Sequence, residues 1–206
     1  MLMNRKGWTV NWTTREHIEE GMSKPFNLVA IQNDFIASDV VKNDPGLIHH
    51  LQKIADNGLI SFYRKKENSN QTQGQFFGID STTTIFTRSN PDSGFVDSGS
   101  EFSEFIYDSV SNLLPGYPTK ILITGKIFCQ ANAPQLIACV SDKDQTVYYS
   151  GFDLNDYTVN ASGWQDIMFQ FVIPAMQSHY GNVKIYFWNN RKTQFHIKDL
   201  RTVFYK

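Results

Sequence analysis

The sequence has little charge and almost no excess of either sign. Lys and Arg number 19 and Asp and Glu number 20 among 206 residues, which gives a formal net charge of −1. Charged residues make up 19% of the chain, below the roughly 25% of an average domain. This balance argues against a nucleic-acid-binding protein, which needs a basic excess to neutralise phosphates. Aromatic residues make up 14%, a content that excludes an intrinsically disordered chain.

Long hydrophobic runs and a targeting segment are also missing. The apolar run at 169–173 is far shorter than the roughly 20 residues of a membrane-spanning helix. Basic residues occur at 1–6, but no apolar stretch follows them, so these residues do not form a signal peptide. If the protein acts outside the cytoplasm, we expect this chain to be part of a larger membrane-anchored protein.

The sequence contains no recognised catalytic or metal-binding motif, such as a nucleophile elbow, a phosphate-binding loop or an H-E-x-x-H zinc site. Glu101 and Glu104 lie three residues apart on an expected strand, so they should face opposite ways and cannot form a local catalytic pair. The segment 153–156 resembles the start of a calcium loop, but Trp164 stands where the ligating Glu belongs, which favours a turn. We therefore predict no enzyme, no metal and no cofactor.

Cys129 and Cys139 are the only cysteines. The segments 120–129 and 135–141 are expected to pair as a hairpin around a turn at 130–134. That register would place the two sulfur atoms roughly 13 Å apart along the ladder. A disulfide needs Cα atoms within about 7 Å. The sequence therefore predicts two free, buried thiols.

The first 66 residues have the pattern of a small α/β segment. A capped helix is expected at 13–21, where Thr13 begins it and Gly21 ends it. A second helix should open at 44–46 and stop at 57–58, because apolar residues recur at helical spacing between them. Strands are expected at 26–31 and 59–63. The polar stretch 67–74 is predicted to be a linker.

From residue 75 the pattern changes to short β-rich runs separated by turn residues. Ile121, Ile123 and Ile127 alternate with Thr124 and Lys126, as in a strand with one buried face. Such runs predict an antiparallel β-sandwich over 75–206. The expected strands are 75–79, 83–88, 101–108, 120–129, 135–141, 146–153, 164–173, 183–189 and 195–205.

The last two of these strands carry the most specific pattern. An aromatic-rich strand ends in Trp188-Asn189, and Ile197-Lys198-Asp199-Leu200 follows. This end resembles the closing strands of jelly-roll carbohydrate-binding-module-like (galactose-binding-like) domains of bacterial cell-envelope proteins. Residues 96–98 with 101–103, and 164–165 before an apolar strand ending at Pro174, match them as well. The resemblance covers 75–206.

The resemblance implies a jelly roll and an extracytoplasmic location, periplasmic or at the cell surface. In the relatives, the last strand carries a pair of acidic residues that can hold a structural calcium. Here that pair is Lys198-Asp199, so one of the acids is missing.

Strand parity suggests a binding surface on 183–189. Val183, Ile185 and Phe187 should share the core face, and Lys184, Tyr186 and Trp188 the opposite face. Pyranose rings stack on exposed aromatic rings, and their hydroxyls need polar partners beside them. The adjoining loop supplies such partners. The predicted ligand-binding residues are Trp188, Tyr186, Lys184, Asn189, Asn190 and Arg191; Tyr148, Tyr149 and His196 are further candidates.

These observations favour a non-catalytic module that binds a polysaccharide or another glycan. The first alternative is a structural accessory domain of a larger membrane-anchored protein, in which Tyr186 and Trp188 pack under a loop or against residues 1–66. A glycan-active enzyme is a third hypothesis. No nucleic-acid partner is expected, and the sequence makes no prediction of the oligomeric state.

Overall fold

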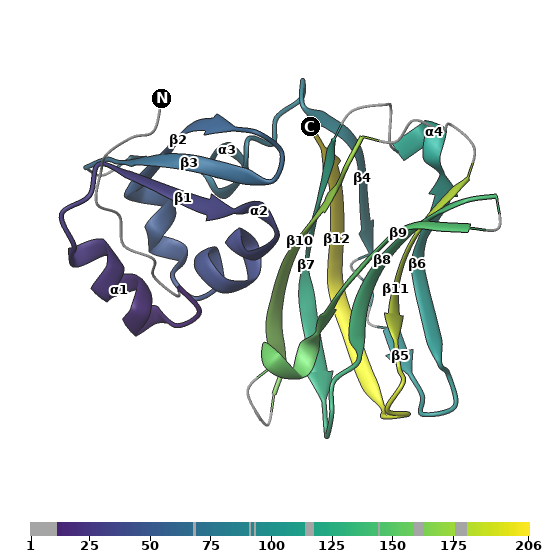
Figure 1. Cartoon of the computed structure of the whole chain (residues 1–206). Coiled ribbons are helices and arrows are strands. Elements are labelled where there is room, and N and C mark those ends of the chain that lie inside the picture. The colour runs from purple at the N-terminus through teal and green to yellow at the C-terminus, as the bar shows by residue number, and fades with distance from the viewer. Residues whose placement is uncertain are drawn as a thin grey trace.

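The computed structural model describes residues 12–67, 69–90, 92, 94–113, 118–143, 145–158, 163–175 and 181–206. Figure 1 shows a small lobe of helices and short strands beside a β-sandwich. The N-terminal lobe, taken here as residues 12–79 without 68, contains α1 (Arg15–Ser23), β1 (Leu28–Gln32), α2 (Asn33–Phe35), the π-helical turn η1 (Ile36–Val41), the 3₁₀ turn η2 (Pro45–His49), β2 (Leu51–Asp56), β3 (Ile60–Lys65) and α3 (Gln73–Phe77).

The remaining elements form the sandwich that the sequence predicts. They are β4 (Thr84–Asn90), β5 (Gly94–Val96), β6 (Phe102–Ser109), α4 (Val110–Leu113), β7 (Thr119–Cys129), β8 (Gln135–Asp142), β9 (Gln145–Asp153), η3 (Leu154–Asp156), β10 (Gln165–Ile173), β11 (Asn182–Trp188) and β12 (Phe195–Tyr205). The expected fold class, an antiparallel jelly-roll-type β-sandwich preceded by a small α/β segment, is therefore confirmed.

Two antiparallel sheets face each other in the sandwich. One sheet has the order β10-β7-β12-β4, with β5 also paired to β12. We call it the middle sheet, because it lies between the N-terminal lobe and the other sheet. The other sheet, which we call the outer sheet, has the order β6-β11-β8-β9. From β6 onward the chain changes sheet at each connection between successive strands, except at the β8–β9 hairpin. Such crossing between two layers is typical of a jelly roll.

The predicted hairpin of 120–129 with 135–141 is wrong, because the two segments lie in different sheets. β7 pairs with β10 and β12 in the middle sheet, whereas β8 pairs with β11 and β9 in the outer sheet. The connection at 130–134 passes from the middle sheet to the outer sheet, and Ala133 within it is fully buried. Cys129 and Cys139 are free, as predicted, and both are half-buried. They lie in different sheets rather than along one ladder.

The N-terminal lobe packs on the other face of the middle sheet. Ile121 and Ile123 of β7 point into the sandwich core, whereas Leu122 between them joins the core of the lobe. Val203 and Tyr205 of β12 also belong to the lobe core. The middle sheet is therefore buried on both faces along this half of its length, as Figure 1 shows. This explains why β10, an edge strand, is apolar on both faces.

Two segments of the lobe differ from the sequence prediction. Residues 51–56 form β2, not the second half of a helix, because they pair with β3 and the helical turn ends at His49. Ile54 lies at the irregularity in this pairing and is exposed. The expected strand at 75–79 is instead helix α3, which ends at Gly78 with a left-handed φ of 79°.

The stretch expected to be a linker makes specific contacts with the lobe. Gln71 donates hydrogen bonds to the carbonyl groups of Ile48 and Leu51. Thr72 and Gln75 form a capping box at the start of α3. The two phenylalanines of α3, Phe76 and Phe77, are buried in the lobe core.

A polar network joins the lobe to the middle sheet. Lys120 Nζ lies 2.6 Å from Asp56 Oδ2, and Asn33 Nδ2 donates to Asp56 Oδ1 at 3.1 Å. Gln170 Nε2 donates to the Asn33 carbonyl at 2.7 Å, and the Tyr205 hydroxyl donates to Gln170 Oε1 at 2.5 Å. Lys120 and Gln170 are buried, so these bonds satisfy polar groups that water does not reach.

We expect Asp56→Asn to destabilise the protein by about 3 kcal/mol at neutral pH, because it leaves the buried Lys120 without its counter-ion. Burial opposes ionisation of Asp56, but hydrogen bonds from Lys120 and the Gly58 N–H outweigh it and hold its pKa well below the usual range. Urea unfolding measures the change. Asp166→Asn is the control, since its 3.8 Å pair with Lys126 is exposed.

The same substitution should change the acid limb of the stability profile. A depressed pKa contributes stability above the unfolded value, near 3.9 for Asp, and that contribution is lost as the pH falls toward the folded pKa. Wild type should therefore lose more stability than Asp56→Asn between about pH 4 and pH 2. Parallel profiles for the two proteins would show that the pair does not stabilise the fold.

Candidate functional site

Strand β11 has the two faces that the sequence predicts. Val183, Ile185 and Phe187 are fully buried in the sandwich core. Lys184, Tyr186 and Trp188 alternate with them on the outer face and are half-buried. Neither Tyr186 nor Trp188 packs against the N-terminal lobe, because the lobe covers the middle sheet and β11 belongs to the outer sheet.

Neighbouring strands extend this outer face with aromatic rings. The register places Trp188 opposite Phe102 and Lys184 opposite Tyr107, both on β6. Lys184 also lies opposite Cys139 of β8, which in turn lies opposite Tyr149 of β9. Phe102, Tyr107 and Tyr149 are 54%, 57% and 54% exposed. We call the five rings of Phe102, Tyr107, Tyr149, Tyr186 and Trp188 the aromatic platform.

Ring contacts hold one end of the platform together. The Phe102 and Trp188 ring centroids lie 6.5 Å apart, with planes only 11° from parallel. Tyr186 meets Phe102 edge-on at 5.7 Å. Burial is the main factor that raises the pKa of Tyr186 to about 12, so its hydroxyl keeps its proton and can donate a hydrogen bond at neutral pH.

Charged groups lie directly beside these rings. Lys184 Nζ is 5.2 Å from the centre of the Tyr107 ring and 3.8 Å from Glu104 Oε1. Trp188 Nε1 donates to Glu101 Oε1 at 3.4 Å. Glu101 and Glu104 therefore both contact outer-face side chains of β11. The opposite-face argument from the sequence is wrong because Glu101 precedes β6, so strand alternation does not apply to it.

The three loop candidates divide into structural and exposed residues. Asn189 is fully buried, and its side chain donates to the carbonyls of Asp97, Ser100 and Thr193 and accepts from the Thr193 N–H. Asn190 is exposed. The structure thus brings Lys184, Tyr186 and Trp188 together and places Asn189 inside the loop.

Arg191 connects the loop after β11 to the turn at 153–156 and to the connection at 130–134. It donates to both carboxylate oxygens of Asp153, at 2.9 and 2.6 Å, and to the Ala133 carbonyl at 3.0 Å. Hydrogen bonds from Arg191 are the largest cause that lowers the pKa of Asp153, to about 2. The segment 153–156 is a capped 3₁₀ turn, as expected, with Asn155 accepting from the Ala133 N–H.

Two further candidates lie away from the platform. Tyr148 packs partly into the sandwich core, on the face opposite to Tyr149. His196 belongs to the middle sheet, where its ring lies among those of Phe95, Phe128 and Trp164. Neither contributes to the outer face of β11.

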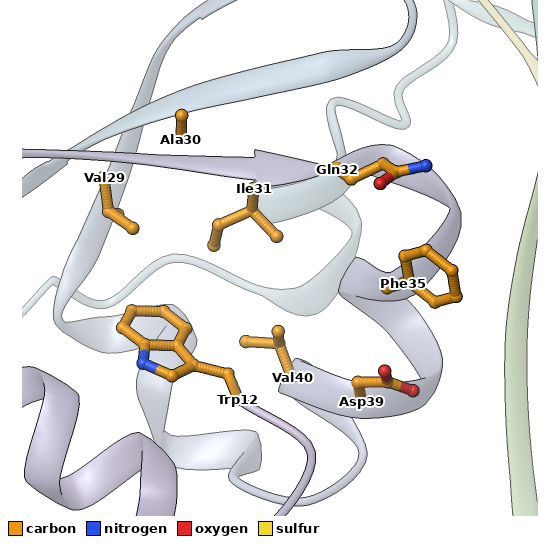
Figure 2. Close-up of a pocket in the computed structure, with 8 residues that line it drawn as sticks. All are labelled: Trp12, Val29, Ala30, Ile31, Gln32, Phe35, Asp39 and Val40. Atoms are coloured by element: carbon orange, nitrogen blue, oxygen red, sulfur yellow. The ribbon is translucent and has the colours of Figure 1, made fainter. Parts of the chain in front are cut away.

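A separate cavity of about 200 Å³ lies in the N-terminal lobe, and none of the predicted site residues lines it. Figure 2 shows Val29, Ile31, Val40 and Trp12 around it. It is smaller than the roughly 300–1,000 Å³ of typical ligand pockets, and thus suits a small group rather than a sugar chain. Its lining residues are Trp12, Val29, Ala30, Ile31, Gln32, Phe35, Asp39 and Val40.

The described residues contain neither a candidate metal centre nor a membrane-spanning helix. No three His, Cys, Asp or Glu side chains among them gather closely enough to hold a metal ion. None of the helices in the same residues has the length and apolar content needed to span a bilayer.

The chain matches no protein-family model and no curated protein. Among solved structures, it is similar to a chain of infectious bursal disease virus, Gx strain, with 12% identity and a TM-score of 0.38 over 87% of this chain and 50% of that one. It is also similar to VP2 of the infectious bursal disease virus subviral particle, with 10% identity and a TM-score of 0.39 over 87% and 52%.

A third similar structure is dimeric latent PorU from Porphyromonas gingivalis, with 6% identity and a TM-score of 0.30 over 71% and 15% of the two chains. The chain spans about half the length of each of the two viral chains and 15% of the length of the bacterial chain.

We expect Asn189→Ala to destabilise the protein by about 2–3 kcal/mol, because several buried hydrogen-bonding groups lose their partner at once. Chemical denaturation measures this change. The matched control is Asn190→Ala, the exposed neighbour, which should alter stability by less than about 0.5 kcal/mol. Equal stability of the two variants would contradict a structural role for Asn189.

Proposed function

We propose that the protein contacts glycans through the aromatic platform, as a non-catalytic module of a cell-envelope protein that acts outside the cytoplasm. The observation that carries this proposal is the exposure of Phe102, Tyr107 and Tyr149 on the same sheet face as Trp188 and Tyr186. Flat aromatic faces are suited to the apolar C–H faces of pyranose rings. The resemblance of 75–206 to galactose-binding-like modules points to the same ligand class.

Polar groups beside the rings fit the other half of a sugar. Glu104 and Glu101 offer carboxylate acceptors, Lys184 offers ammonium donors, and Tyr186 offers a protonated hydroxyl. Sugar hydroxyls need such donors and acceptors close to the stacking surface. The combination favours a ligand that is apolar on one face and hydroxylated at its edges.

The platform is broad rather than enclosed. Its rings come from β6, β11 and β9, which span three interstrand spacings of the outer sheet, or roughly 14 Å. Such a surface is wider than a single sugar ring and suits internal units of an extended polysaccharide. Ligand contact through stacking alone requires no bond making or breaking, which agrees with a non-catalytic role.

Trp188→Ala should weaken binding to a responsive polysaccharide at least tenfold, because removal of an aromatic ring that stacks on a ligand commonly costs more than 1.4 kcal/mol. A glycan array with wild type identifies the ligand, and calorimetry with that ligand compares the variants. Phe102→Ala should show a similar loss, since its ring lies against Trp188.

The control for this experiment is Phe62→Ala, which removes an exposed aromatic from the N-terminal lobe and should leave affinity unchanged. Thermal melting of each variant shows that the fold is retained. Absence of any array signal from wild type, or equal affinity of wild type and Trp188→Ala, would reject the proposal.

A structural accessory role is the second candidate, and an exposed apolar surface on the lobe favours it. β3 is the central strand of the three-stranded sheet, and Ile60 and Phe62 lie on its solvent face. Leu28 of β1 lies opposite Arg64, on the same face as Phe62, and Leu59 and Ile54 are exposed nearby in sequence. Contiguous apolar surface of this kind marks protein interfaces.

If this apolar surface serves an interface, the isolated chain should self-associate through it as concentration rises, because the partner that covers it is absent. Phe62→Arg should then shift the chain to a monomer in sedimentation velocity experiments. Asn190→Ala, at an exposed loop on the sandwich, should not change the distribution. A monomeric wild type at all concentrations would argue against the accessory role.

A further inference from the structure

The N-terminal lobe covers only part of the middle-sheet face that points away from the sandwich core. Leu122 of β7 lies in the lobe core, and Phe128, six residues later on the same strand, shares its face by alternation. Phe128 contacts rings of β12 and of the residue before β10, not the lobe. In Figure 1 this end of β7, with the starts of β10 and β12, lies at the bottom of the sandwich, away from the lobe.

A second aromatic group occupies this uncovered end. His196 is at its centre, with ring centroids 4.9 Å from Phe95, 6.0 Å from Phe128 and 6.4 Å from Trp164. Phe95 and Trp164 are 54% and 40% exposed, so two large rings face solvent. With Lys198, these four residues form what we call the basic aromatic cluster.

Lys198 distinguishes this cluster from an apolar patch. Its Nζ lies 4.2 Å from the centre of the Trp164 ring, within cation–π range. Among the described residues it has no carboxylate partner, whereas Lys126, opposite it on β7, lies 3.8 Å from Asp166. The indole of Trp164 thus positions the Lys198 ammonium group, and the N–H donors of that ammonium group stay free for an external anion.

Basic residues outnumber acidic ones near Lys198 on this face, where Lys126 and its partner Asp166 also lie. The register pairs Arg201 with Thr124, which alternates with Leu122 and Lys126 and therefore shares their face. Arg201 is exposed and adds positive potential to that of Lys198. Lys126, Lys198 and Arg201 outnumber Asp166 there, and a net positive potential next to stacking rings favours an anion that carries an apolar face.

We propose that the basic aromatic cluster is a second binding site, specific for an acidic sugar unit of an anionic polysaccharide. The sugar ring stacks on Trp164 and Phe95, and its carboxylate or sulfate accepts hydrogen bonds from Lys198 and His196. The site shares no residue with the aromatic platform and lies on the other sheet, so it goes beyond the function proposed above and can be tested separately.

Single-stranded nucleic acid also combines stacking with cations, but its binding grooves follow many successive phosphates with a run of basic residues. This chain carries a net charge of −1, and its cluster offers one unpaired ammonium at the rings. These features suit one anionic group per stacked ring, which is the pattern of an acidic polysaccharide.

Affinity electrophoresis of the full chain tests the site. Gels contain polygalacturonate, dextran sulfate, neutral dextran or single-stranded poly-dT. We expect retardation by one or both acidic polysaccharides, at least tenfold weaker binding to neutral dextran, and loss of the difference at high salt. Retardation by polygalacturonate assigns a carboxylate ligand, and retardation by dextran sulfate alone assigns a sulfate ligand.

Lys198→Gln and Trp164→Ala should each weaken binding to the acidic polymer at least tenfold. Lys126→Gln, which removes the same charge from the ion-paired neighbour, should change it less than threefold. The proposal is overturned by equal effects of Lys198→Gln and Lys126→Gln, by equal binding of neutral and acidic polymers, or by tighter binding of poly-dT.

Discussion

The middle sheet is buried on both faces along the half that contacts the N-terminal lobe, and this double burial determines how the rest of the chain is placed. β7 sends Ile121 and Ile123 to one core and Leu122 to the other, so a shift of one residue would exchange the two cores. The lobe also brings Asp56 against the buried Lys120. An ion pair at such a boundary is stabilising only when further hydrogen bonds satisfy its groups, and Asn33 and the Gly58 N–H both donate to the Asp56 carboxylate here.

Because the lobe takes one half of one sheet face, two other sheet surfaces of the sandwich remain open. One is the outside of the outer sheet, which carries the aromatic platform, and the other is the free end of the middle sheet, which carries the basic aromatic cluster. Both combine exposed rings with charged groups, as in Lys184 beside Tyr107 and Lys198 above Trp164. Burying a ring such as Phe102 would gain roughly 1.5–3 kcal/mol, so the fold leaves this stabilisation unused at both surfaces.

Local patterns predicted the strands of the sandwich well, because a strand with one buried face shows its alternation in sequence. The two faces of β11 follow from that rule alone. Pairing between strands is not predictable in the same way, because tertiary packing determines which strands pair. This is the case for residues 51–56 and for the strands within 120–141. The place of Phe102 and Tyr107 in the aromatic platform does not follow from the sequence for this reason, since only the β6–β11 register places them beside residues about 80 positions later. Asn189 was misassigned because a buried loop amide and an exposed one look alike in sequence.

The exposed rings of the sandwich differ from the exposed apolar face of the lobe in what surrounds them. Ile60 and Phe62 lie on a small sheet beside Leu28 and Ala30, and a surface of this composition is complementary to another apolar protein surface. The platform and the cluster each place a lysine within about 5 Å of a ring centre. Each surface thus combines an apolar ring with a charged group a few ångströms away, and a sugar ring alternates between apolar face and polar edge on the same scale. The chemistry of the neighbours is therefore our reason for proposing ligand binding for the sandwich and protein contact for the lobe, and the two proposed roles can coexist in one chain.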